Sequence, residues 1–225
     1  MEDYLSEKER WEWVRAQVRE NAPAVLLAVV VVLASLGGWR WWQDRQDADR
    51  LAASGRYMDM VEALDKGDRA QALVLLGELE RDNAGSSYTD QAKMLAARMY
   101  VDNGELDKAA TELSAVSSNA KDRNLASVAR LRLARVQVAQ GKADAALATL
   151  GTDGATAFAG RAHEVRGDAY FAKGDPAKAL SEYQAAKAAA NGAPSPLLDL
   201  KIADLSASAP AAAAPTAALP AVPVK

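Results

Sequence analysis

The chain has 225 residues, a formal net charge of −3 and no cysteine. The length allows one large domain or a smaller domain with appended segments, and the nearly balanced charge supplies no basic excess for binding a nucleic-acid backbone. The lack of cysteine excludes disulfides, thiolate metal sites and cysteine nucleophiles.

An uncharged run follows a charged tail of 20 residues. Residues 21–39, NAPAVLLAVVVVLASLGGW, carry no charge. As a helix they would span about 29 Å, close to the roughly 30 Å hydrocarbon core of a bilayer. The valines would favour a strand in water, but in lipid only a helix satisfies its own backbone. We therefore expect a tail over 1–20 and a transmembrane helix over 21–42.

Tryptophan marks both ends of this run. Indole rings favour the headgroup layer of a membrane, so five residues are the expected membrane interface: Trp11, Trp13, Trp39, Trp41 and Trp42. A buried core helix and a cleaved signal peptide are the alternatives. A core of this size rarely needs a helix that is apolar on every face, and the run exceeds the 7–15 residues typical of a signal peptide. Basic residues flank the run equally, so charge does not orient it.

Beyond residue 43 the chain repeats itself. The equivalent segments are DKGDRAQALVLL, DNGELDKAATEL, AQGKADAALATL and AKGDPAKALSEY. Their glycines lie 37, 37 and 33 residues apart, at Gly67, Gly104, Gly141 and Gly174. A period of this length is typical of a helical repeat protein.

Residues at fixed distances from each glycine indicate how a unit folds. Seven residues before it stand Met60, Ala97, Ala134 and Gly167, and five after it stand Ala72, Ala109, Ala146 and Ala179. Nine after it stand Leu76, Leu113, Leu150 and Tyr183. We interpret each unit as a helix, a left-handed glycine turn and a second helix, with the small residues allowing close packing. The fold class predicted is all-α, one transmembrane helix followed by a helical-repeat solenoid over 43–192.

Two helix starts carry capping signals. Asp175 and Pro176 are typical of an N-cap followed by the first helical residue. Ser87 with Asp90 is typical of a capping pair before QAKMLAARMYV.

The fourth unit resembles a tetratricopeptide repeat. Six of its residues stand at that family's spacing: Gly167, Tyr170, Gly174, Ala179, Tyr183 and Ala186. The other three units are degenerate, and all four lack the closing proline of that family. The whole plan, with the opening YLSEKERWEWVRAQVRENAPAVL, resembles the ancillary subunit of the bacterial Sec translocon.

That second resemblance implies a location and partners. The tail would lie in the cytoplasm, the span in the inner membrane and the repeats in the periplasm. The partners implied are the Sec translocon, a membrane-anchored periplasmic prolyl-isomerase-like chaperone, unfolded secreted or envelope proteins, and the lipid bilayer, with no nucleic acid. The expected role is chaperone-like hand-over of translocated proteins. A scaffold for another envelope assembly, or a regulator that sequesters a signalling partner, stays open as the alternative.

The first helix of each unit would line a concave binding face. By the tetratricopeptide register, the expected protein-binding groove contains Tyr57, Met94, Arg98, Val101, Leu131, Arg135, Val138 and Phe171. Apolar side chains would give affinity, and the arginines would hold a carboxylate or a backbone carbonyl. The alternative is that these side chains only pack between units.

No catalytic arrangement is predicted. The single histidine, His163, is expected to fill a contact between helices, and no nucleophile stands with a base. We therefore predict no enzyme activity, no cofactor and no metal site.

The end of the chain is expected to close the array. Leu198, Ile202 and Leu205 recur at helical spacing, so residues 193–205 are predicted as a capping helix. Residues 206–225 are rich in alanine and proline without an apolar pattern and are predicted to be disordered.

Overall fold

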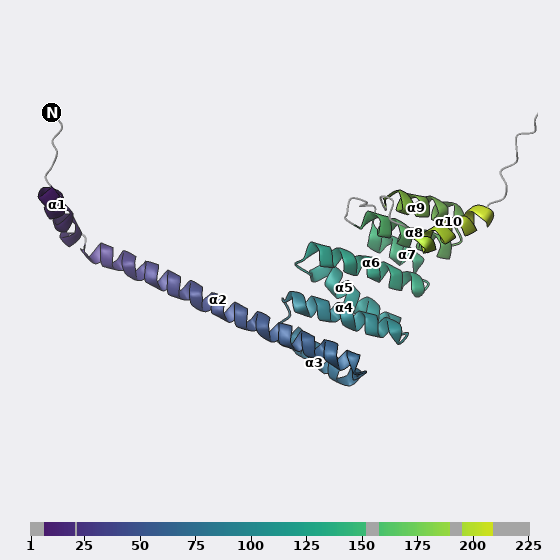
Figure 1. The fold of residues 1–225 in the computed structure, drawn as a ribbon, viewed down its shortest axis with the longest axis horizontal. Helices are drawn as coiled ribbons and strands as arrows, with labels where there is room; N and C mark the ends of the chain where they lie inside the picture. The colour runs from purple at the N-terminus through teal and green to yellow at the C-terminus, as the bar shows by residue number, and fades with distance from the viewer. Residues whose placement is uncertain (1–6, 21, 152–157, 190–194, 209–225) are drawn as a thin grey trace, which may run out of the picture. The chain divides into compact units, whose positions relative to one another are not determined.

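The computed structural model describes residues 7–20, 22–151, 158–189 and 195–208. Every regular element in these ranges is an α-helix, which confirms the all-α prediction (Figure 1). The helices are α1 (Glu7–Glu20), α2 (Ala22–Asp65), α3 (Arg69–Asp82), α4 (Ser87–Asp102), α5 (Leu106–Asn119), α6 (Arg123–Ala139), α7 (Ala143–Leu150), α8 (Ala159–Ala172), α9 (Pro176–Ala189) and α10 (Pro196–Ser208). Most of the predicted disordered tail lies outside the described residues.

Helix α2 has 44 residues and joins the two compact units of the chain, Met1–Arg56 and Tyr57–Lys225. It continues past residue 42, where the membrane span was expected to end, so the span and the first repeat helix are one helix. Pro23 stands in the first turn, where its missing N–H costs no hydrogen bond. After the apolar part, the rest of α2 contains no proline, and pairs such as Arg50 with Asp47 (3.1 Å) support the helix.

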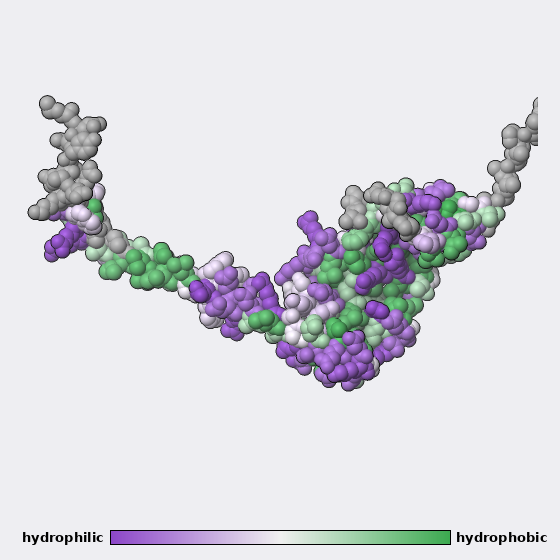
Figure 2. Space-filling model, in the orientation of Figure 1, coloured by the Kyte–Doolittle hydropathy of each residue, from purple (hydrophilic) through white to green (hydrophobic). Residues whose placement is uncertain are grey.

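The N-terminal part of α2 is long and apolar enough to cross a membrane, and none of its apolar window is buried within the chain. Figure 2 shows this part as a continuous hydrophobic band followed by a hydrophilic stretch. The exposure argues against the core-helix alternative, because a core helix is covered by its own domain. At the end of the band the ring centres of Trp39 and Trp42 lie 5.6 Å apart. The Arg45 guanidinium carbon lies 5.6 Å from the centre of the Trp41 ring.

The repeats are helix pairs joined by glycine turns of one design. The pairs are the end of α2 with α3, α4 with α5, α6 with α7, and α8 with α9. Each turn glycine has φ between 74° and 76°, a conformation that glycine adopts without a steric penalty. At the first turn Gly67 N–H donates to Leu64 O (3.0 Å) and Asp68 N–H donates to Ala63 O (2.8 Å). The same pair of hydrogen bonds recurs at the other three turns and satisfies carbonyls at the end of the first helix of each unit.

Small residues sit where the two helices of a pair come together. The alanines five residues after each glycine are all completely buried. Gly167 shows the strictest requirement, because the Tyr183 ring of α9 occupies the space that a Cβ at Gly167 would fill. The close approach of α8 and α9 therefore depends on glycine at this position.

Capping signals predict one helix start correctly and miss another by one residue. Asp175 Oδ1 accepts from Lys178 N–H at 3.1 Å, and α9 begins at Pro176, as expected. At the start of α4 the cap is Ser86, whose Oγ accepts from Tyr88 N–H at 3.2 Å, so the prediction of Ser87 is wrong. Two adjacent serines carry the same local signal, and only the backbone path selects between them.

Helix α10 covers the last repeat. Leu198 and Leu205 are buried with Tyr183 of α9, and Ile202 packs against them, so the three predicted residues form the contact face. Lys201 Nζ donates to Asp168 Oδ1 at 2.7 Å and to Glu164 Oε1 at 3.1 Å. The helix ends at Ser208, three residues beyond the expected end, and Ser206 Oγ donates to Ile202 O at 2.7 Å in this last turn.

Tyr183 links α8, α9 and α10. Its hydroxyl donates to Asp168 Oδ1 at 2.8 Å, and the Lys201 ammonium lies 5.4 Å from its ring centre. Burial, and then the hydrogen bond to Asp168, raise the pKa of Tyr183 well above its ordinary value. The hydroxyl therefore stays protonated and keeps donating across the physiological range.

Replacing Gly167 with alanine should destabilise the repeat unit by about 1–3 kcal/mol, because the added methyl group overlaps the Tyr183 ring. The control is Gly77→Ala in α3, where an added Cβ meets nothing within 4 Å. This substitution should stabilise the helix by about 0.5–1 kcal/mol, because alanine favours the helix more than glycine does. Urea unfolding of the full chain in detergent, followed by circular dichroism, measures both. Equal stability of the two variants would contradict the close approach of α8 and α9.

Candidate functional site

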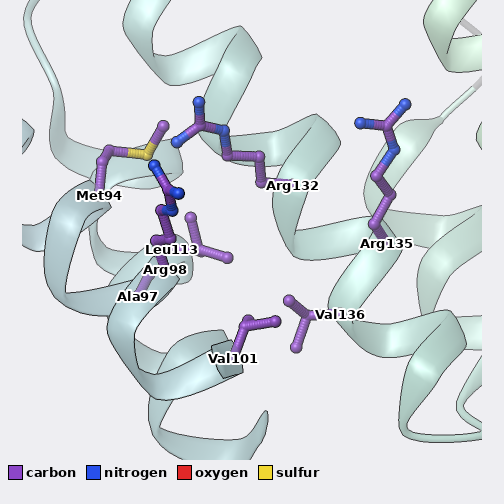
Figure 3. Close-up of a pocket in the computed structure, with 8 residues that line it drawn as sticks. All are labelled: Met94, Ala97, Arg98, Val101, Leu113, Arg132, Arg135 and Val136. Atoms are coloured by element: carbon purple, nitrogen blue, oxygen red, sulfur yellow. The ribbon is translucent and has the colours of Figure 1, made fainter. Parts of the chain in front are cut away.

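A pocket of about 380 Å³ lies between two neighbouring repeats (Figure 3). Helix α4 contributes the first wall, α5 one side chain and α6 the second wall. The lining residues are Met94, Ala97, Arg98, Val101, Leu113, Arg132, Arg135 and Val136. The pocket therefore combines apolar side chains with three arginines.

The apolar surface of the pocket follows from the repeat pattern. Ala97 stands seven residues before a turn glycine and Leu113 nine residues after it, and both are buried. Val101 is 41% exposed, and in Figure 3 it faces Val136 across the pocket. Such a surface suits an aliphatic side chain of a ligand.

The three arginines keep most of their donors available. Arg98 Nε lies 3.8 Å from Asp102 Oδ2, and Arg135 Nη2 lies 3.8 Å from Glu164 Oε2. Both separations exceed the roughly 2.7–3.2 Å of a hydrogen bond, so these are loose ion pairs. Among the described residues, Arg132 has no ion-pair partner and none of the three guanidinium groups donates a hydrogen bond.

Comparisons with known proteins agree with this architecture. The family model described as a tetratricopeptide repeat-like domain matches residues 15–207. The ancillary SecYEG translocon subunit of Escherichia coli (strain K12) is 34% identical over 207 residues, which cover 92% of this chain and 100% of that protein.

The chain belongs to the family of ancillary SecYEG translocon subunits.

Other relatives and one solved structure extend the comparison. The ancillary SecYEG translocon subunit of Neisseria gonorrhoeae is 32% identical, and the match covers 70% of this chain and 77% of that protein. The subunit of Aggregatibacter actinomycetemcomitans is 27% identical, and the match covers 89% of this chain and 98% of that protein. The solved structure of the MamA RS-1 ArsTM double mutant has a TM-score of 0.50 at 19% identity, covering 69% of this chain and 95% of that one. This last likeness shows the fold alone.

Four of the expected groove residues line the pocket of this ancillary subunit family member: Met94, Arg98, Val101 and Arg135. Four others lie elsewhere. Leu131 and Val138 pack in the cluster that joins α6 to α7 and α8. The ring centre of Tyr57 lies 6.0 Å from that of Tyr88. Phe171 is 55% exposed and does not line the pocket. Leu131 and Val138 therefore pack between helices and do not face a groove, as the alternative interpretation of these residues expected.

The position of the pocket between two repeats explains this division. Helix α4 presents to it the face that carries Met94 and Val101. Helix α6 presents a different face, which carries Arg132 and Val136. Leu131 and Val138, the residues equivalent to Met94 and Val101, pack instead in the cluster with α7 and α8. The sequence carried a partial signal for Arg132, because it is three residues from Arg135 and shares its helix face.

His163 fills a contact between helices, as predicted. Its Nδ1 lies 2.7 Å from Glu182 Oε2 of α9, and Arg166 Nη1 lies 3.1 Å from the same histidine nitrogen. Arg166 is buried, and its other terminal nitrogen has no hydrogen-bond partner among the described residues. The five tryptophans are exposed, and their role as a membrane interface stays a prediction.

Leu131→Ala should destabilise the protein by about 2–5 kcal/mol, because Leu131 belongs to a buried cluster. Val101→Ala should change stability by no more than about 0.5 kcal/mol, because Val101 borders the pocket and is 41% exposed, outside the buried core. Urea unfolding of the full chain compares the two. A similar loss in both variants would show that the pocket wall is packed as tightly as the core.

Proposed function

We propose that this chain is a non-enzymatic, membrane-anchored protein-binding subunit that works with the Sec translocon. The observation that carries the proposal is the match to ancillary SecYEG translocon subunits over 92% of the chain, including its apolar helix and its repeats. A match of this extent supports the same arrangement of anchor and repeat domain, and with it the same association.

The proposed location is the inner membrane, with the short N-terminal tail in the cytoplasm and the repeats in the periplasm. The apolar part of α2 supplies the anchor. The direction rests on the family resemblance, because the basic residues on the two sides of the span are balanced.

The proposed activity is reversible binding of protein segments, which supports chaperone-like hand-over of translocated chains. The pocket between α4 and α6 supports it, because it offers apolar walls and hydrogen-bond donors to an extended segment. A membrane-anchored prolyl-isomerase-like chaperone is the proposed second partner, and unfolded secreted or envelope proteins are the proposed clients. Such binding needs no covalent chemistry and no cofactor.

A photoreactive residue at Val31 tests the association in living cells. Val31 lies in the exposed apolar part of α2, so irradiation should yield adducts with translocon subunits, which mass spectrometry identifies. The matched control is Val74 in α3, which is equally exposed but lies in the repeat domain and should give a different set of adducts. Adducts at Val31 with another envelope assembly, and none with the translocon, would favour the scaffold alternative and overturn the proposal.

A further inference from the structure

We propose that the pocket between α4, α5 and α6 selects peptide segments in which an acidic side chain stands beside aliphatic ones. The inference rests on the proposed protein-binding function and names the class of segment that this site prefers. The group that the arginines bind is a carboxylate on a protein chain.

The first support is the shape and apolar character of the site. A volume of about 380 Å³ accepts one or two side chains of a ligand and is too small for a folded element. Ala97, Leu113 and Val136 form a surface that has no polar side-chain atom. An aliphatic side chain buried there loses contact with water, which gives affinity without requiring one particular residue.

The second support is the placement of the three arginines. In Figure 3 the side chains of Arg98, Arg132 and Arg135 all extend to the same side, away from the facing pair Val101 and Val136. A ligand side chain between the valines would therefore have neighbours along its own chain close to the guanidinium groups. Segments that combine both kinds of residue would satisfy both parts of the site.

The third support is charge. Three guanidinium groups border the pocket, and within the described part of the chain only Asp102 and Glu164 are paired with any of them, each at 3.8 Å. Arg132 has no ion-pair partner among the described residues. A planar guanidinium binds a carboxylate through two parallel hydrogen bonds, which a backbone carbonyl cannot match. The unused donors therefore favour an acidic side chain over a neutral segment.

The test uses the full chain in detergent and three fluorescein-labelled peptides, with binding measured by fluorescence anisotropy. The first peptide, ASLEVELSG, combines acidic and aliphatic residues. The second, ASLQVQLSG, replaces each acid with its neutral isostere, and the third, ASSESESSG, removes the aliphatic residues. The first should bind about tenfold more tightly than either of the others, and added salt should weaken only the preference over the second.

Variants locate the binding in the pocket. Arg132→Gln should weaken binding of ASLEVELSG about tenfold and leave ASLQVQLSG unchanged. Arg130→Gln is the matched control, because Arg130 is exposed on the same helix and does not line the pocket. Val101→Glu, which puts a carboxylate three residues after Arg98 on α4 and replaces part of the apolar wall, should abolish the preference for the acidic peptide, whereas Val74→Glu on α3 should not.

The outcomes separate this inference from the proposed function. Equal binding of ASLEVELSG and ASLQVQLSG by the unaltered chain would overturn the inference and leave a groove for apolar segments intact. Equal effects of Arg132→Gln and Arg130→Gln would also overturn it, because the preference would then arise from general surface charge. Failure to bind any of the three peptides would overturn both the inference and the peptide-binding role of this pocket.

Discussion

The close contact between the two helices of each repeat is the constraint on which the domain depends. A left-handed glycine reverses the chain, and a small residue five positions later lets the second helix return against the first. Where the contact is tightest, at Gly167, a tyrosine ring takes the place of a side chain. That same tyrosine anchors Asp168 and, through it, the terminal helix α10. Packing within one pair thus determines how the end of the array is closed.

The candidate site is a product of stacking rather than of any single repeat. Each helix pair buries its own small residues, and the space between α4 and α6 is bordered both by residues of those cores, such as Ala97 and Leu113, and by the three arginines. Arginines can occupy such positions at little cost, because their charged ends reach solvent while their aliphatic stems lie along the wall. In this family member the proposed binding surface and the hydrophobic core therefore share residues of the same helices.

Local signals predicted most of the fold and about half of the site. The glycine turns followed from the sequence, because a left-handed residue at a fixed period leaves few alternatives to a helix pair. The cap at Ser86 did not, because its neighbour Ser87 carries the same chemistry. Arg132 and Leu131 are adjacent, yet one borders the pocket and the other is buried. Which of them faces outward depends on where α4 and α7 lie, and this is information that no short stretch of sequence contains.

The continuity of α2 has a consequence for how the repeat domain can be separated from the apolar part of this helix. The hydrogen-bond ladder of this helix runs from Ala22 to Asp65 without a break, so any cut made after the tryptophans falls inside a helix. The new end would leave about four amide groups without partners and would begin to fray toward Met60, which is buried in the first repeat. A soluble fragment would therefore need a designed N-cap, such as serine or aspartate, several turns ahead of the glycine at position 67 to keep that repeat folded.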